Sequence, residues 1–237
     1  MLKRCLAIVA VLFVQTTLAS EPAGQNPAPI AEYSVDYTSE YRVGWFSFDI
    51  EATRTLSRRS DQLWNLTFNA EASIASLNEI SDFLIQGQQI VPVNYSYRSS
   101  GVIDEDDRTL HFMADSRTIE DTERNRVITD QWQDGIQDNL TYMLQAGFYL
   151  SQGLQEFSFP VFEKKKTKTF HFKVVGEETI KTKAGSFDAI KVQQVRKDKK
   201  REIYAWFAKV DGYPMIRLRD RKNGDLRYQI QATRLSR

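Results

Sequence analysis

Hydrophobic residues alternate with polar residues through most of this chain from residue 30 onward. Tyr33, Val35 and Tyr37 are separated by single polar residues, and so are Phe170 and Phe172. A period of two places alternate side chains on opposite faces of a β-strand, so that one face is buried and the other meets water. The sequence therefore predicts a mainly β fold, a large curved antiparallel sheet or open half-barrel.

Polar turns separate the predicted strands. Asn223-Gly224 is the strongest hairpin signal, because a type I′ turn needs positive φ at both central positions. Turns are also predicted at 176–179, 183–186 and 196–201. Besides the two alternating segments, strands are predicted at 45–50, 63–68, 83–85, 90–97, 109–113, 127–132, 157–162, 187–195, 203–208, 214–218 and 226–233.

One segment, 138–152, has the period of a helix instead. Asp138 can cap its first turn, and Gly153 can end it. Gly147 inside the segment costs about 1 kcal/mol relative to Ala. We expect one amphipathic helix against the concave or open side of the sheet. Its apolar residues are spaced by three and four, at Leu140, Tyr142-Met143-Leu144, Phe148 and Leu150.

The first nineteen residues have the pattern of a secretory signal peptide. Lys3 and Arg4 precede an apolar run at 6–14, and small residues follow. A membrane-spanning helix needs about 20 apolar residues, so a retained anchor is the less favoured alternative. We predict a Sec-type signal peptide at 1–19, a flexible leader at 20–29 and a single domain at 30–237. The protein would be exported, periplasmic in a Gram-negative bacterium, with no stable transmembrane anchor after cleavage.

Composition narrows the possible functions. The single Cys lies in the predicted signal peptide, so the mature chain would have no disulfide and no thiol nucleophile. With 32 Lys and Arg against 31 Asp and Glu, the chain lacks the excess positive charge of a nucleic-acid binder. Its mean hydropathy of −0.47 excludes a polytopic membrane protein.

No motif for catalysis or cofactor binding is present. The sequence has no G-x-S-x-G, Walker loop, H-E-x-x-H or G-x-G-x-x-G. Its two histidines, His111 and His171, are too far apart in sequence to suggest a metal site, which usually needs three or four ligands. The acidic cluster 104–107 has ligand chemistry suited to Ca²⁺, but an exposed hairpin tip explains it more simply. We therefore expect no enzyme activity, no cofactor and no metal.

An ordered series of motifs, mainly in the second half, resembles the DUF3108 family of exported bacterial proteins of unknown function. The resemblance implies an exported β-rich domain and assigns no catalytic residue. Trp206-Phe207 followed by Pro214 also resembles the LolA/LolB-like lipoprotein carriers, in which a curved antiparallel sheet wraps a hydrophobic cavity. The motifs that resemble DUF3108 occupy 90–92, 95–98, 137–144, Gly153, 170–175, 184–192, 204–208 and 212–217.

The aromatic content suggests a binding cavity. With 14 Phe, 10 Tyr and 4 Trp, the sheet has more apolar surface than one helix can cover. A lipid-like ligand, apolar or amphipathic, would shield the remainder, whereas a fully packed β-sandwich or small barrel is the alternative. The candidate cavity residues are Trp45, Phe48, Trp64, Phe68, Tyr142, Phe148 and Trp206.

Two basic patches are candidates for contact with anionic headgroups. The alternative is that their charges keep the hairpins and sheet edges soluble. We expect a non-enzymatic protein that binds a ligand in cell-envelope transport or maintenance. The rival expectations are a module that binds an envelope protein and, less favoured, an enzyme acting on envelope polymers. The patches comprise Lys164, Lys165, Lys166 and Lys168, and Arg196, Lys197, Lys199, Lys200 and Arg201.

Overall fold

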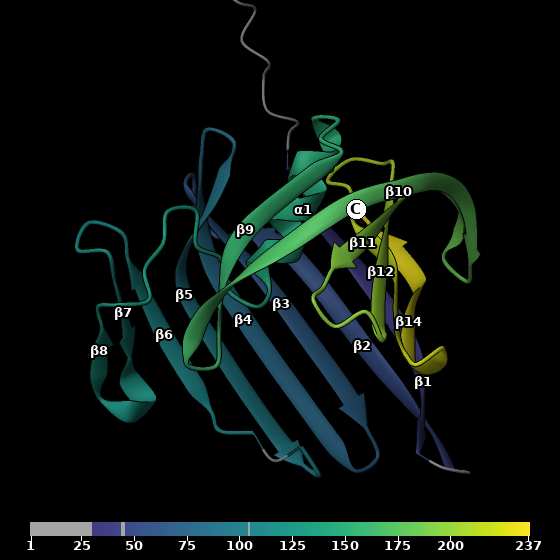
Figure 1. The fold of residues 1–237 in the computed structure, drawn as a ribbon, viewed down its shortest axis with the longest axis horizontal. Coiled ribbons are helices and arrows are strands. Elements are labelled where there is room, and N and C mark those ends of the chain that lie inside the picture. The colour runs from purple at the N-terminus through teal and green to yellow at the C-terminus, as the bar shows by residue number, and fades with distance from the viewer. Residues whose placement is uncertain (1–29, 44–45, 104) are drawn as a thin grey trace, which may run out of the picture.

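The computed structural model describes residues 30–43, 46–103 and 105–237, so the predicted signal peptide and leader lie outside the described residues. Within those ranges, fourteen antiparallel strands form one curved sheet (Figure 1). The strands are β1 (Tyr33–Val43), β2 (Phe46–Arg58), β3 (Leu63–Ala72), β4 (Ala75–Gln86), β5 (Gln89–Gly101), β6 (Arg108–Met113), β7 (Thr118–Asp121), β8 (Arg126–Ile128), β9 (Glu156–Glu163), β10 (Lys166–Thr182), β11 (Gly185–Val195), β12 (Arg201–Ala208), β13 (Met215–Lys222) and β14 (Asp225–Ser236).

The two ends of the described chain meet in the middle of the sheet. β1 pairs with β14, and every other pair joins strands that are consecutive in the sequence. β8 and β9 are the two edge strands and do not pair with each other, so the sheet does not close into a barrel. The predicted curved antiparallel sheet with one α-helix against it is confirmed.

The helix α1 (Thr141–Ser151) lies inside the curve, between the N-terminal half of the sheet and the crossing strands β9 and β10 (Figure 1). Gln145 fixes it to β5, because its Oε1 accepts the Ile90 N–H at 2.7 Å and its Nε2 donates to the Gln88 carbonyl at 3.0 Å. Just before the helix, Gln137 forms a parallel bridge with Val161 of β9. The helix segment thus joins the two halves of the sheet from within.

Polar contacts of Asp138 and a glycine define the ends of α1. The helix begins at Thr141, so Leu140 is its N-cap and the prediction of Asp138 in that position is wrong by two residues. Asp138 still satisfies the first turn, because its Oδ1 accepts the N–H groups of Leu140 and Thr141, both at 2.8 Å. Gly153 has a φ of +82° just past the helix, as predicted for its end.

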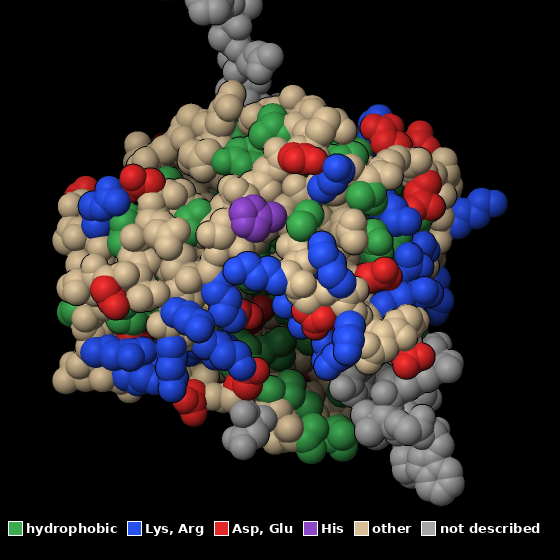
Figure 2. All heavy atoms as spheres, in the orientation of Figure 1, with side chains coloured by type: hydrophobic (Ala, Val, Ile, Leu, Met, Phe, Trp, Pro, Cys, Tyr) green, Lys and Arg blue, Asp and Glu red, His purple; other side chains and the backbone are tan. Residues whose placement is uncertain are grey.

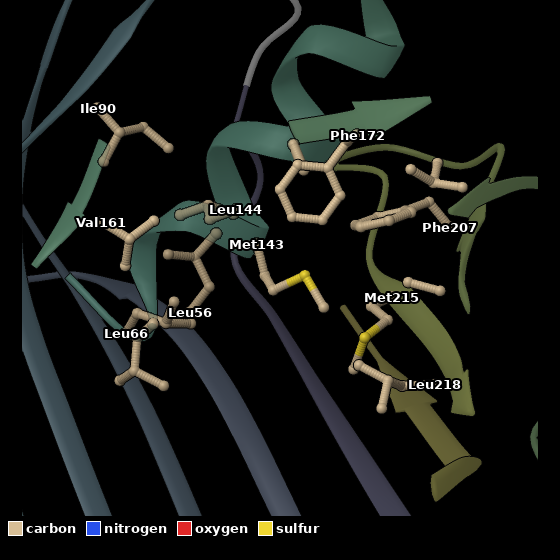
Figure 3. Close-up of a cluster of buried hydrophobic side chains, with 14 of the residues drawn as sticks. Leu56, Leu66, Ile90, Met143, Leu144, Val161, Phe172, Phe207, Met215 and Leu218 are labelled. Carbon is tan, nitrogen blue, oxygen red and sulfur yellow. The ribbon is translucent and has the colours of Figure 1, made fainter. Parts of the chain in front are cut away.

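The core fills much of the concave face around α1. Met143 and Leu144 of the helix point between Leu56 and Val161 on one side and Phe207 on the other (Figure 3). All five side chains are at least nine-tenths buried. The helix is buried over most of its circumference, because it packs against strands from both halves of the sheet.

The long strand β10 departs from the sequence prediction. A turn was expected at 176–179, but β10 continues to Thr182 through a register shift between Val174 and Gly176. Beyond this bulge the strand arches onto the outer face of the sheet, where Arg217 Nη2 donates to the Lys181 carbonyl at 3.2 Å.

Two further local predictions have opposite outcomes. The turn at Asn223-Gly224 is confirmed, with φ values of +54° and +87°. The strand expected over 127–132 is shorter, because β8 ends at Ile128. After that residue the chain leaves the sheet edge and enters the interior ahead of α1.

We predict that Gly147→Ala destabilises the protein. Helix propensity alone favours Ala by about 1 kcal/mol, but a Cβ at this position would lie 2.8 Å from the Tyr213 carbonyl oxygen. Overpacking of this kind costs about 1–3 kcal/mol, so we expect a net loss of roughly 1 kcal/mol in chemical denaturation. A more stable variant would show that α1 does not pack against the Tyr213 backbone.

Candidate ligand-binding hollow

Two adjoining pockets occupy the part of the concave face that α1 leaves open. The first has a volume of about 230 Å³ and the second about 370 Å³, and Tyr228 lines both. We call them together the hollow. It is visible in Figure 2 as a recess with hydrophobic atoms inside and Lys and Arg side chains around it. The first pocket is lined by Tyr37, Thr38, Ser39, Ile50, Ala52, Phe68, Ala70, Tyr228 and Ile230.

The second pocket lies under α1 and the crossing strands. Tyr142 and Met143 of the helix form part of its wall, and Phe170 lies at 5.4 Å from Tyr142 between ring centroids. The remaining lining residues come from the concave face of β9–β14 and include both apolar and charged side chains. They are Glu163, Lys168, Phe172, Val192, Gln194, Arg196, Arg201, Ile203, Ala205, Leu218 and Tyr228.

A row of charged and aromatic side chains crosses the floor of the N-terminal half-sheet. Strand register places Arg54, Phe68, Glu79, Tyr97 and Arg108 side by side on β2 to β6. The Arg54 guanidinium lies 5.7 Å from the Phe68 ring centroid, and that of Arg108 lies 3.9 Å from the Tyr97 centroid. Cations at these distances are attracted by the negative face of the ring. The row has two positive charges and one carboxylate.

Glu79 is the only carboxylate in that row, and its environment favours the protonated form. Burial raises the pKa of Glu79, and the hydrogen bond from Tyr95 and the charges of Arg54 and Arg108 oppose this only in part. Tyr95 donates to Glu79 Oε1 at 2.5 Å and accepts a hydrogen bond from Asn139 at 3.2 Å. This chain of hydrogen bonds connects the sheet floor to the start of α1.

The neighbouring carboxylate Asp138 is also deeply buried. Its Oδ2 accepts a hydrogen bond from Ser81 at 2.5 Å, in addition to the backbone N–H groups that its Oδ1 accepts. Burial raises the pKa of Asp138 more than these hydrogen bonds lower it. Two acidic groups with raised pKa values therefore lie beneath the helix.

Basic side chains form the rim of the second pocket. Arg201 donates to Asp220 at 2.7 Å, and this fully buried carboxylate also accepts a hydrogen bond from Arg227 at 3.1 Å. These contacts raise the pKa of Arg201. Lys168 pairs with Glu163. Arg196 has no carboxylate partner in the described part of the chain, and its Nε is buried without a hydrogen bond.

The structure separates the predicted basic residues into two groups. Lys168 and Arg201 line the second pocket, together with Arg196. Lys164 instead forms an ion pair at 3.0 Å with Glu105, in the segment between β5 and β6. The other predicted anion-contacting residues are exposed to solvent, namely Lys165, Lys166, Lys197, Lys199 and Lys200.

The predicted cavity residues are likewise dispersed. Phe68 and Tyr142 line the hollow. Trp64 is half-buried against the core beneath the Arg58 guanidinium, and Phe148 lines a separate pocket of about 70 Å³ beside Gly147. The described residues include neither Trp45 nor the side chain of Phe48.

Trp206 does not line the hollow, and its assignment to the cavity is wrong. It pairs with Lys191 and Arg217, on the face opposite to Ala205, which lines the second pocket. Trp206 is only 2% exposed because cationic side chains and the arched β10 cover it, and its Nε1 donates to Glu178 at 2.8 Å. Phe207, the next residue, points to the opposite face of the strand and is buried in the core.

Sequence reasoning missed two residues of this region, Arg54 and Tyr228. Arg54 lies between Ala52 and Leu56 in an alternating segment whose inward positions are otherwise small or apolar. A charged residue at an inward position of a strand is the available signal, because arginine is rarely buried without a partner. Tyr228 offers no comparable signal, since tyrosine is common on both faces of a strand.

The described ranges contain no cluster of three or more His, Cys, Asp or Glu side chains suited to a metal ion. His171 is exposed, and a ring nitrogen of His111 lies 2.7 Å from the Asn94 side-chain oxygen. Within the same ranges, α1 is too short to cross a bilayer, and no other helix reaches the necessary length and hydrophobicity.

The fold and the hollow define a β-barrel-like protein with an open sheet and a partly filled interior. The chain belongs to the DUF3108 family, described as "Protein of unknown function", which matches residues 32–231. No match was found among curated proteins.

Solved structures of similar fold have very different sequences. A β-barrel-like protein of the domain of unknown function DUF1849 from Brucella abortus has a TM-score of 0.59 at 6% identity. The alignment covers 87% of this chain and 98% of that one. A protein with a YmcC-like fold from Bacteroides fragilis has a TM-score of 0.39 at 10% identity, with 88% and 98% covered. At an identity of 6%, the similarity to the Brucella abortus protein shows a shared fold and nothing about function.

We predict that Glu79→Gln changes the pH dependence of stability. Because the pKa of Glu79 is raised on folding, the native state holds this proton more tightly than the unfolded chain. The free energy of unfolding of the wild-type protein therefore falls as the pH rises from about 4.5 through the native pKa of Glu79. The variant has no carboxyl group at this position and lacks this decrease. Its stability relative to the wild type should therefore increase with pH. Urea denaturation from pH 4 to pH 8 tests this, and a constant difference would contradict it.

We predict that Trp206→Ala affects stability without affecting the hollow. Removing a buried Trp costs about 3–5 kcal/mol, and this side chain lies on the outer face. The variant should unfold at lower denaturant concentration yet, when folded, retain the wild-type affinity for any ligand of the hollow. A selective loss of ligand binding would place Trp206 in the binding site.

Proposed function

We propose that this protein is a non-enzymatic carrier or sensor that binds an amphipathic, lipid-like molecule in the hollow. The observation that carries the proposal is the pair of adjoining pockets that share Tyr228. Ligand pockets usually have volumes of about 300–1,000 Å³ and mostly apolar walls with a few polar groups. The hollow is within this range and combines an almost wholly apolar first pocket with a charged rim on the second.

The distribution of side chains in the hollow suits an elongated molecule. Ala52, Phe68, Ala70 and Ile230 offer apolar contact to an alkyl chain. Lys168, Arg196 and Arg201 at the second pocket offer contact to a polar end. The α1 segment occupies the rest of the concavity, so the ligand would be bound beside the helix rather than in an empty barrel.

The proposed location is the cell envelope. The signal-peptide pattern at 1–19 supports export. An amphipathic ligand is abundant at membranes, and a protein that shields the apolar part of such a molecule from water would serve lipid transport or maintenance of the envelope. LolA-like carriers provide the architectural analogy that the sequence suggested.

A substitution that fills the first pocket tests the proposal. Ala70→Trp places a large ring in the pocket and should weaken binding of a fluorescent fatty-acid analogue by at least about tenfold, because a ligand cannot share space with the ring. Mass spectrometry of gently purified wild-type protein should detect retained lipid, and the variant should lack it.

Asn69→Trp is the matched control. Asn69 is the preceding residue of β3, is exposed and lies on the opposite face, so its substitution should leave binding unchanged. If the wild-type protein neither retains nor takes up lipid, the proposal is wrong. Specific cross-linking to an envelope protein in the absence of bound lipid would then favour the interaction-module alternative.

A further inference from the structure

We infer that the ligand of the hollow is an anionic amphiphile whose carboxylate or phosphate binds Arg54. This inference rests on the proposed function and specifies the chemical class of the ligand. Arg54 is 7% exposed, and its Nε is buried without a hydrogen-bond partner. Among the described residues, no carboxylate forms an ion pair with it.

Arg54 lines neither pocket itself, but it lies next to residues that do. Ala52, two residues earlier on the same strand face, and Phe68, its cross-strand neighbour, line the first pocket. The charge of Arg54 also acts on the Tyr142 hydroxyl, which belongs to a residue of the second pocket. A negative group held by Arg54 would therefore lie beside the residues that line the space available for an alkyl chain.

Arg108, the other buried arginine of the described residues, has a carboxylate partner, because its guanidinium lies 3.4 Å from Glu105, although its Nε also lacks a hydrogen bond. The partly buried Arg201 and the exposed Arg227 share Asp220. Glu79 lies near Arg54 in the row of the half-sheet floor, but it bonds with Tyr95 instead, and its raised pKa weakens it as a counter-charge. A buried guanidinium without a counter-charge is costly, and a bound anion would remove that cost.

The rim favours the same sign of ligand charge. Arg196 has neither a carboxylate partner nor a hydrogen bond to its Nε in the described part of the chain. Cations around an apolar recess raise the local concentration of anions. An anionic amphiphile would thus be attracted by the rim and then held by Arg54, whereas a neutral or cationic one would gain neither interaction.

Three ligands with the same C18 chain separate charge from hydrophobicity: oleate, oleyl phosphate and oleyl alcohol. Binding to the purified protein is measured below the critical micelle concentration by competition with a fluorescent probe. We expect oleate or oleyl phosphate to bind at least about tenfold more tightly than the alcohol, in line with a charged hydrogen bond. The headgroup that binds more tightly identifies the carboxylate or the phosphate as the natural group.

Arg54→Met should remove the preference for anions and leave the affinity for oleyl alcohol unchanged. Arg54→Lys, which keeps the charge, should retain part of it. The matched control is Arg58→Met on the same strand, because the Arg58 guanidinium already donates to the carbonyls of Ser60 and Asp61. This control should bind all three ligands as the wild type does.

Thermal unfolding of the ligand-free protein gives a second readout. Because Arg54 has no ion-pair partner in the described part of the chain, removal of its buried charge should raise the Tm of Arg54→Met by about 2–4 °C. A marked fall in Tm would show that Arg54 has an essential partner within the protein and would overturn the inference.

The binding outcomes separate the two proposals. Equal affinity for the three ligands would refute the anionic class while leaving lipid binding intact. Binding of none of them would refute the proposed function and this inference together.

Discussion

The position of α1 inside the curved sheet depends on a few buried amide and carboxylate contacts. Gln145 supplies both a donor and an acceptor to the backbone where β5 begins, and Gln137 completes a bridge to β9. Backbone groups at these points would otherwise be buried without partners, which costs about 1–3 kcal/mol each. These contacts explain why the helix fills one end of the concavity and leaves the hollow at the other.

The open sheet makes this internal bracing necessary. A closed barrel satisfies the hydrogen bonds of all its strands, but here β8 and β9 remain edges. Besides the β1–β14 ladder, the two halves are joined through the interior by the helix segment and across the opening by the Lys164–Glu105 ion pair. Exposed ion pairs contribute only about 0–1 kcal/mol, so on the side of the opening the buried contacts of the helix segment are the stronger connection.

The sequence predicted the strand-rich fold and the single helix because both depend on local periodicity. It also predicted the turn at Asn223-Gly224, where backbone conformation follows from residue type. The arch of β10 could not be predicted, because Gly176 permits either a turn or a bulge and only the pairing with β11 decides between them. The strand alternation likewise separated Trp206 from Phe207 without showing which of the two faces is concave.

The candidate site was less predictable because it depends on register across five strands. Phe68 and Tyr142 could be selected as aromatic residues of the inner surface, but the row containing Arg54, Glu79 and Arg108 exists only once β2 to β6 are aligned. A single arginine in an apolar alternation was the one signal in the sequence. Whether this arginine has a carboxylate partner can be decided only from the positions of the surrounding side chains in the folded protein.

An apolar pocket beside a buried arginine that has no ion-pair partner among the described residues involves a conflict between stability and binding. A fully apolar floor would be more favourable for folding, because burying an unpaired charge is opposed by desolvation. The attraction of the Phe68 ring for Arg54 offsets part of this desolvation in the free protein, and in our proposal the negative group of the ligand offsets more of it in the bound protein. Such a compromise between folding and function is common at binding sites. In this protein the unfavourable desolvation is confined to the Arg54 side chain, and the packing of the surrounding β-sheet is favourable enough to offset it.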